Sequence, residues 1–433
     1  MDVTIIGLLG LALLLALLVT GVPIALAMAV SGIVGLWVLE GPSATIAHVA
    51  LIPWDEGRSF VIVTIPLFVL MGQLVFHTGL AADLYDGVQK WIGRIPGGLA
   101  VTSVLACAGF GAVTGSSIAT VATMGSIVMP EMRRHGYDSR LATGALAASG
   151  TLGILIPPSV IFIFYGVMTE TSIGALFIAG IVPGILTALT FSAIILVRCL
   201  LKPELGPKGP PSSWSQRLRA VTRLAPIGSL FVLVIGGIYA GIFTPTEAAG
   251  IGCMGVIVAA ALLRKLTATA LSRGLRSTAL IASMIFAIIM GGYLMARFLA
   301  VTGLTQDVVS FLVSMQLGRV SFLLLLVVLF LILGAMLDVF GMLVLTIPFV
   351  VPVIEELGID LIWFGVFAVI MAELALVTPP IGANVFVMRR VAPEVPMGDI
   401  FLGVAPFVAG VLAVLALLIA FPELALWLPR QMG

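Results

Sequence analysis

Charged residues are scarce in this chain. Lys, Arg, Asp and Glu make up 9% of its 433 residues, whereas hydrophobic residues make up 61%. A water-soluble domain carries roughly 25% charged residues, so the composition excludes a soluble globular protein. The net charge of +1 says nothing about nucleic acid, and no nucleic acid is expected as a partner.

Residue clusters that carry metal or nucleotide chemistry are missing as well. Cysteine and histidine each occur three times and stand isolated, as Cys107, Cys199, Cys253, His48, His77 and His135. The sequence has no HExxH motif, and no Gly-Lys dipeptide that a phosphate-binding loop would need. These absences argue against an enzyme and against an ATPase within the chain.

Long apolar runs are what the sequence does contain, for example Val3–Thr20, Phe231–Ala249, Ser321–Leu337 and Phe401–Leu428. Each run is close to the ~20 residues that cross a bilayer as a helix. The runs lack the period-two alternation of membrane strands, so they predict helices. No basic residue precedes the first run, which therefore indicates a membrane helix rather than a cleaved signal. The expected fold is an all-α polytopic membrane protein in a lipid bilayer.

The two halves of the sequence resemble each other at an offset of 222 residues. At this offset four proline pairs coincide, namely Pro23 with Pro245, Pro130 with Pro352, Pro157 with Pro379 and Pro158 with Pro380. Such self-similarity indicates a duplication. We predict a first repeat over residues 1–200, a polar cytoplasmic linker over 201–222 and a second repeat over 223–433.

Basic residues orient the two repeats, because loops rich in Lys and Arg stay in the cytoplasm. The basic clusters are Lys90/Arg94, Arg133–Arg140, Arg198–Arg223, Arg264–Arg276 and Arg389/Arg390. All five clusters can lie on the cytoplasmic side only if each repeat crosses the membrane about five times and holds one re-entrant hairpin. The odd number of crossings inverts the second repeat, a pattern typical of transporters. It also places the acidic turn Glu355–Asp360 and both termini on the periplasmic side.

Each repeat contains a glycine-interrupted segment followed by a helix interrupted by two prolines. We predict hairpins over residues 98–132 and 320–355, and broken helices over 140–168 and 361–388. Proline removes a backbone donor and leaves a carbonyl free. In a bilayer a free carbonyl needs a polar partner, and a cation is one such partner. The N-termini of half-helices can also hold an anionic group.

These breaks predict one cation site in each repeat. The first would use Thr114, Ser116 and Ser117 with the carbonyls of Gly153, Ile156 and Pro158. The second would use Gly334, Asp338, Ala375, Thr378, Pro380 and Asn384. A proline kink packed by Gly and Ser is the structural alternative, but its recurrence in both repeats favours binding. Three further polar residues keep two interpretations each. Glu373 is structural or binds an ion, Glu247 caps a helix or acts in transport, and Arg297 snorkels or meets a substrate.

Four motifs, in order, resemble the large membrane subunit of TRAP (tripartite ATP-independent periplasmic) transporters. They are Thr114–Ser126, Leu155–Ser159, Ile242–Ala249 and Thr378–Asn384. The resemblance implies an elevator-type member of the ion-transporter superfamily in the bacterial inner membrane, with Na⁺ as coupling ion at the hairpin sites. It also implies two partners: a small four-helix membrane subunit, expected as a separate chain, and a periplasmic substrate-binding protein that delivers organic acids such as dicarboxylates or sialic acid.

The resulting expectation is sodium-coupled import of a small organic anion that lies between the hairpins, near Ser117 and Asp338. One alternative is a stand-alone sodium/carboxylate symporter or antiporter of the same superfamily. Others are a channel, an intramembrane enzyme or the permease of an ATP-driven importer. The sequence names neither the acid, nor the number of sodium ions, nor the oligomeric state.

Overall fold

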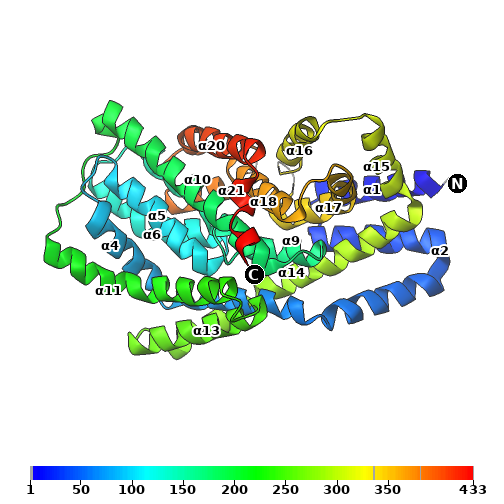
Figure 1. Ribbon diagram of the computed structural model, residues 1–433, viewed down its shortest axis with the longest axis horizontal. Coiled ribbons are helices and arrows are strands. Elements are labelled where there is room, and N and C mark those ends of the chain that lie inside the picture. Colours follow the sequence, from blue (N-terminus) through cyan, green and yellow to red (C-terminus); the bar gives the residue numbers. More distant parts are fainter. Residues whose placement is uncertain (1–2, 335–336, 381, 433) are drawn as a thin grey trace.

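The computed structural model describes residues 3–334, 337–380 and 382–432, and every regular element in these ranges is a helix (Figure 1). Ala335 and Met336 of the second predicted hairpin, and Ile381 of the second broken helix, lie outside the described residues. The first half comprises α1 (Val3–Val19), α2 (Ile24–Gly57), η1 (Phe60–Val63), α3 (Thr64–His77), α4 (Leu80–Ile92), α5 (Gly98–Thr114), α6 (Ser117–Arg134), α7 (Ser139–Ser149), α8 (Leu152–Leu155), α9 (Val160–Met168) and α10 (Ile173–Leu201).

A short turn, η2 (Pro203–Leu205), leads into the second half. That half comprises α11 (Trp214–Phe231), η3 (Val232–Gly236), α12 (Gly237–Tyr239), α13 (Pro245–Leu262), α14 (Ala268–Thr302), α15 (Leu304–Ser314), α16 (Arg319–Gly334), α17 (Val339–Glu356), α18 (Leu361–Val377), α19 (Ala383–Val391), α20 (Met397–Ala420), α21 (Glu423–Leu426) and η4 (Pro429–Gln431). Helix α11 starts within the range 201–222 predicted as a linker, because Ser213 and Gln216 form a capping box there.

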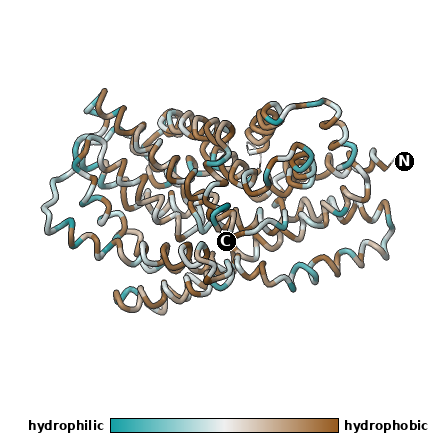
Figure 2. The backbone as a smooth tube through the Cα atoms, in the orientation of Figure 1, coloured by the Kyte–Doolittle hydropathy of each residue, from teal (hydrophilic) through white to brown (hydrophobic). Residues whose placement is uncertain are grey.

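Eight helices of the described residues are long and apolar enough to cross a membrane, or nine when the bent pair around the first diproline is counted as one span. Hydrophobic residues follow these helices along most of their length, and hydrophilic residues gather at their ends and connections (Figure 2). Large apolar side chains point outward, among them Leu26, Trp37 and Val38 of α2. Because such a surface is unfavourable in water, the fold is that of a multi-pass membrane protein.

Contacts between the halves come in matched pairs. Helix α2 packs on α14, and the equivalent helices of the other repeat, α13 and α3, also pack on each other. In the same way, the contact of α6 with α19 is matched by that of α17 with α9. The contact of α7 with α20 is matched by that of α18 with α10. Several of these contacts depend on glycine. A side chain at Gly32 of α2 would lie 2.8 Å from the carbonyl of Leu294 in α14. The two halves are therefore packed into each other rather than placed side by side.

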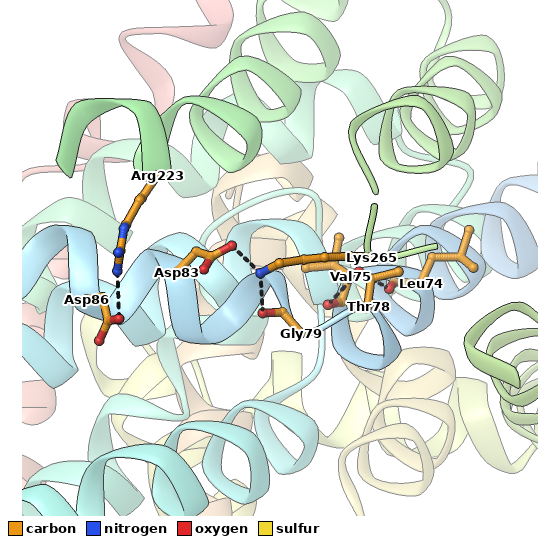
Figure 3. A network of polar contacts seen from close by, with 8 residues as sticks. All are labelled: Leu74, Val75, Thr78, Gly79, Asp83, Asp86, Arg223 and Lys265. Carbon is orange, nitrogen blue, oxygen red and sulfur yellow. Dashed lines mark hydrogen bonds and ion pairs between the residues drawn. The ribbon is translucent and has the colours of Figure 1, made fainter. Parts of the chain in front are cut away.

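The segment before the first hairpin, α4, is attached to the second half by ion pairs (Figure 3). Asp86 accepts from Arg223 of α11 at 2.9 Å, and Asp83 pairs with Lys265, which follows α13. Its counterpart α15 contacts α1 through a hydrogen bond of 3.3 Å from Thr4 to Asp307. The segment before each hairpin is thus joined to the other half or to the first helix by polar contacts.

The connection between the halves lies against the base of the first hairpin. Gly97 donates to the carbonyl of Gly206 at 2.9 Å, and Asp138 donates to that of Leu205 at 3.0 Å. The hydroxyl of Tyr137 donates to the carbonyl of Pro207 at 2.8 Å. Burial raises the pKa of Tyr137 to about 12, so this hydroxyl remains a donor at neutral pH.

Candidate functional site

The first hairpin is formed by α5 and α6, and its tip is a single tight turn. Helix α5 ends at Thr114, Gly115 takes the left-handed conformation with φ of 59°, and Ser116 caps α6. The Ser116 hydroxyl accepts from the backbone N–H of Ala119 at 3.4 Å. A side chain on Gly115 would lie 3.0 Å from the carbonyl oxygen of Pro158. The tip therefore touches the first diproline break.

The first break separates α7 and α8 from α9, which are bent by 44°. Pro157 has no N–H and cannot donate to the carbonyl of Gly153, four residues earlier. A side chain on Gly153 would lie 3.1 Å from the carbonyl of Ser116. The structure thus brings Thr114, Ser116, Gly153 and Pro158 together, as the sequence groups them. Ile156 packs on Gly184 of α10, where an added Cβ would meet its Cγ1 at 2.6 Å.

The second hairpin is formed by α16 and α17, with Asp338 as the N-cap of α17. The Asp338 carboxylate accepts from the backbone N–H of Gly341 at 2.9 Å. Gly334 closes α16 directly against α18, because a Cβ there would lie 2.2 Å from the Cβ of Ala375. Gly334, Asp338 and Ala375, three of the residues predicted for the second site, line the same cavity.

The second break differs from the first in its exposure. Helix α18 ends at Val377, and the Thr378 hydroxyl donates back to the carbonyl of Leu374 at 2.8 Å. Pro380 is exposed, whereas Pro157 and Pro158 at the first break are buried. The predicted ligands Thr378 and Pro380 hence stand in a more open environment than their counterparts.

Asn384 lies at the first hairpin although the sequence groups it with Asp338. Its side-chain nitrogen donates to the Ser117 hydroxyl at 2.7 Å and to the carbonyl of Ala147 at 3.1 Å. Its oxygen is buried and has no hydrogen-bond partner among the described residues. Asn384 thus joins the second broken helix to the first hairpin and to α7.

A cavity of about 390 Å³ lies between the two hairpin tips. Both tips line it, with Thr114–Ile118 from one side and Leu337–Phe340 from the other. Ser117 and Asp338, the two residues predicted to contact substrate, both belong to the lining. The volume falls within the range typical of small-molecule sites.

Sequence reasoning missed the part of the cavity wall that α3 and α14 provide. This wall consists of Val69, Gln73, Ile281, Met284 and Ile285. One signal was available, since Gln73 is an uncharged polar residue within the apolar run of α3. The apolar residues of this wall cannot be recognised from the sequence, because lipid-facing positions carry the same residue types.

The three open residues fall in different environments. Glu373 is 0% exposed, and neither carboxyl oxygen has a hydrogen-bond partner among the described residues. Glu247 forms a capping box with Thr244, which confirms its interpretation as a helix cap. Arg297 is exposed and is absent from the described lining of the cavity. The described residues contain no cluster of three His, Cys, Asp or Glu for a transition metal.

Comparison with known proteins gives matches along almost the whole chain. A family-wide sequence model described as "Tripartite ATP-independent periplasmic transporter, DctM component" matches residues 11–424. The chain is 34% identical over 390 residues to the C4-dicarboxylate TRAP transporter large permease protein DctM of Pseudomonas aeruginosa, covering 90% of this chain and 91% of that protein. It is 32% identical to the sialic acid large permease SiaM of Vibrio cholerae, with 86% and 87% covered. It is 31% identical to the ectoine large permease TeaC of Halomonas elongata, with 96% and 97% covered.

Solved structures share the fold at lower sequence identity. The YdaH transporter of Alcanivorax borkumensis matches with a TM-score of 0.61 and 15% identity, covering 91% of this chain and 90% of that one. The MtrF efflux pump of Neisseria gonorrhoeae matches with a TM-score of 0.61 and 13% identity, covering 89% and 85%. At such identities the likeness concerns the fold alone.

Proposed function

Because the chain belongs to the DctM-component family of tripartite ATP-independent periplasmic transporters, we propose that it imports an organic acid by a sodium-coupled elevator mechanism. Its relatives are permease subunits of transporters rather than enzymes. Family membership also sets aside the rival interpretations of channel, intramembrane enzyme and ATP-driven permease. The family works with a periplasmic binding protein and a small membrane subunit, and we propose one of each as partners in a bacterial inner membrane.

The observation that carries this proposal is the single cavity bounded by both hairpin tips. Each tip starts a helix of 18 residues, α6 at Ser117 and α17 at Val339. Unpaired N–H groups and the helix dipole make such N-termini favourable for an anion. A substrate carboxylate would therefore lie between Ser117 and Asp338.

Sodium fits the oxygen-rich groups beside each tip. Around the first tip these are the hydroxyls of Thr114 and Ser116 and the carbonyls released at the diproline. Around the second they are the Asp338 carboxylate and the backbone near Gly334 and Ala375. Hard cations prefer such oxygen donors. A bound cation beside Asp338 would also offset the repulsion between this carboxylate and a substrate anion.

An elevator motion would move the hairpins and broken helices as one body. Two ion pairs support this grouping, Arg140 of α7 with Asp399 of α20 at 2.7 Å and Arg133 of α6 with Glu394 before α20. Asn384 of α19 adds hydrogen bonds to Ser117 of α6 and to Ala147 of α7. Helices α2, α3, α13 and α14, which pack on each other through close contacts, would form the stationary scaffold. The matched contacts between the halves support a two-fold relation between the repeats. The positions of the basic clusters favour the inverted form of this relation, with both termini in the periplasm.

The test is uptake by proteoliposomes that contain this chain, its small membrane subunit and the binding protein. We expect accumulation of a radiolabelled organic acid when sodium is higher outside, and loss of accumulation when sodium is replaced by potassium. Equal uptake in both salts would refute the coupling. Uptake by this chain in the absence of the binding protein would instead favour a stand-alone symporter or antiporter.

A further inference from the structure

A second cavity lies apart from the hairpin tips and has a basic lining. Its volume is about 320 Å³, and among the described residues it shares no lining with the cavity between the tips. The lining consists of Asp138, Arg140, Arg198, Leu201, Lys202 and Leu205. Its basic residues belong to the clusters that the sequence assigns to the cytoplasm, so the cavity lies at the cytoplasmic end of the first half.

Backbone hydrogen bonds hold the walls of this cavity together. The start of α7 and the end of α10 are linked through η2, because the N–H of Asp138 donates to the carbonyl of Leu205 at 3.0 Å. The N–H of Lys202 donates to the carbonyl of Arg198 at 2.9 Å and closes α10. The basic side chains are therefore carried by a backbone that the fold itself fixes.

The protein neutralises only part of the positive charge in the cavity. Arg140 pairs with Asp399 of α20 at 2.7 Å. Arg198 makes no ion pair in the described part of the chain, and its Nη1 is buried without a hydrogen-bond partner. A buried donor without an acceptor is unfavourable, and a bound anion would supply the acceptor.

The acidic residue of the described lining does not cancel this charge. The Asp138 carboxylate accepts from the backbone N–H of Leu141 at 2.9 Å and caps α7. Arg198 and Lys202 together therefore exceed the charge of a carboxylate that the helix already uses. The first N–H groups of α7 also have no partner within their helix. The cavity thus offers a surplus of donors to an anionic group.

Apolar surface adjoins the charged cavity along α10. Leu201, the last residue of this helix, lines the cavity and is 77% exposed. Leu189 and Val197 are also exposed, and their helical spacing puts all three on one side of α10. Since α10 is long and apolar enough to span the membrane, this side faces acyl chains and the cavity lies at the level of the headgroups. A free phosphate ion would use only the charged part of this arrangement.

We propose that this cavity binds the phosphate group of an anionic phospholipid in the cytoplasmic leaflet, with the acyl chains along α10. Arg198 and Lys202 donate to the phosphate oxygens, as basic residues do in pockets between membrane helices on the cytoplasmic side. A zwitterionic lipid is disfavoured, because its ammonium group would enter a cavity of positive charge. The inference concerns a different cavity from the proposed transport site and does not depend on sodium coupling.

Lipid titration of the purified complex of this chain and its small membrane subunit, followed by native mass spectrometry, tests the inference. Phosphatidylglycerol should bind more tightly than phosphatidylcholine with the same acyl chains, by about fivefold for each basic residue that lacks a partner. Arg198→Gln and Lys202→Gln should each lower the affinity for phosphatidylglycerol by about fivefold and leave that for phosphatidylcholine unchanged. Equal affinities of the wild-type complex for the two lipids would overturn the proposal.

Matched variants separate this cavity from general attraction to a basic surface. Arg219→Gln removes the same charge from an exposed residue of α11 that is absent from the described lining, and it should leave the affinity near wild type. Arg198→Lys keeps the charge and should retain most of the lipid preference. An equal loss in Arg219→Gln and Arg198→Gln would overturn the site. Full displacement of phosphatidylglycerol by inorganic phosphate would also overturn it, because the cavity would then hold a small anion rather than a lipid. If Arg198→Gln does not fold, Lys202→Gln at an exposed position decides.

Discussion

At the scale of single residues, Asn384 makes the most specific polar contact at the candidate site. Its side-chain amide donates to two acceptors in the first half, which are the Ser117 hydroxyl and the carbonyl of Ala147. We expect Asn384→Leu to lower the free energy of unfolding by about 1–3 kcal/mol, because a buried carbonyl loses its donor. Thermal unfolding of the purified protein in detergent measures this change.

A matched control for this variant is Thr378→Val in the same broken helix. The Thr378 hydroxyl donates only within its own helix, to Leu374, so its loss should change stability by less than about 1 kcal/mol. If both variants lower the free energy of unfolding equally, the contact of Asn384 with the first half stabilises the protein no more than a hydrogen bond within one helix.

Glu373 presents the opposite case, a wholly buried carboxyl with no hydrogen-bond partner in the described structure. Replacement of an unpaired buried polar group by an apolar one of similar size commonly stabilises a protein. We therefore expect Glu373→Met to raise the free energy of unfolding by about 1–2 kcal/mol, as measured by thermal unfolding in sodium-free buffer.

The position equivalent to Glu373 in the first half supplies the control. Thr151 donates to the carbonyl of Ala148 at 2.7 Å, so Thr151→Val should give no gain in stability. If the same measurement in sodium buffer shows Glu373→Met to be less stable than wild type, the carboxyl has a partner there, such as a bound ion. The ion-binding interpretation of Glu373 would then be favoured over the structural one.

At the scale of secondary-structure elements, the contact between the first hairpin and the first broken helix depends on paired glycines. A Cβ on Gly111 of α5 would lie 2.3 Å from the Cα of Gly153 in α8. Backbone atoms cannot move aside as a flexible side chain can, so Gly111→Ala must separate the two elements. We expect a destabilisation of about 1–3 kcal/mol from overpacking and a loss of most sodium-dependent uptake.

Gly109→Ala, two residues earlier on the same helix, is the control for this prediction. The nearest atom to its added Cβ would be the Cδ2 of Leu84 at 3.3 Å, a side-chain atom that can shift by rotation about its own bonds. Unfolding temperature and proteoliposome uptake should both stay near wild type. If Gly111→Ala behaves like Gly109→Ala, the close approach of α5 and α8 has no role in transport.

At the scale of the whole molecule, much of the helical framework could be predicted from the sequence. Apolar runs of membrane length give α1 and α20, and the glycine and proline interruptions fall at the observed ends of α5, α16 and α18. The run Phe231–Ala249 is not one helix, because a capping box at Thr244 starts α13 within it. These features are local, because proline and glycine act on the backbone of their own turn. The polar stretch predicted as the linker contains the start of α11, which the capping box at Ser213 marks.

The candidate site was only partly predictable, because it depends on contacts between distant segments. The grouping of Ser116 with Gly153 follows from their neighbouring motifs, and the structure places them together. Asn384 and Ser117 are 267 residues apart in the sequence, and no local sequence pattern predicts their contact. Met284 lines the cavity, but its sequence position gives no sign of this, because it is one apolar residue among many in α14.

The relative orientation of the two repeats is the claim on which the elevator proposal depends, and labelling can test it. The loop around Arg134 and the turn around Glu356 occupy equivalent places after α6 and α17, and both residues are exposed. Inversion puts the first loop in the cytoplasm and the second in the periplasm. The native thiols of Cys107, Cys199 and Cys253 are buried. Labelling of a single introduced cysteine can therefore be measured without replacing the native cysteines.

We expect a membrane-impermeant maleimide to label Glu356→Cys in right-side-out vesicles, and to label Arg134→Cys only after the vesicles are opened. The physical reason is that an odd number of crossings must separate two equivalent loops of opposite orientation. Wild-type vesicles, treated in parallel, should remain unlabelled. Labelling of both variants from the same side would mean that the repeats are parallel. The two hairpins would then enter the membrane from one face, and a cavity alternating between faces could not form between their tips.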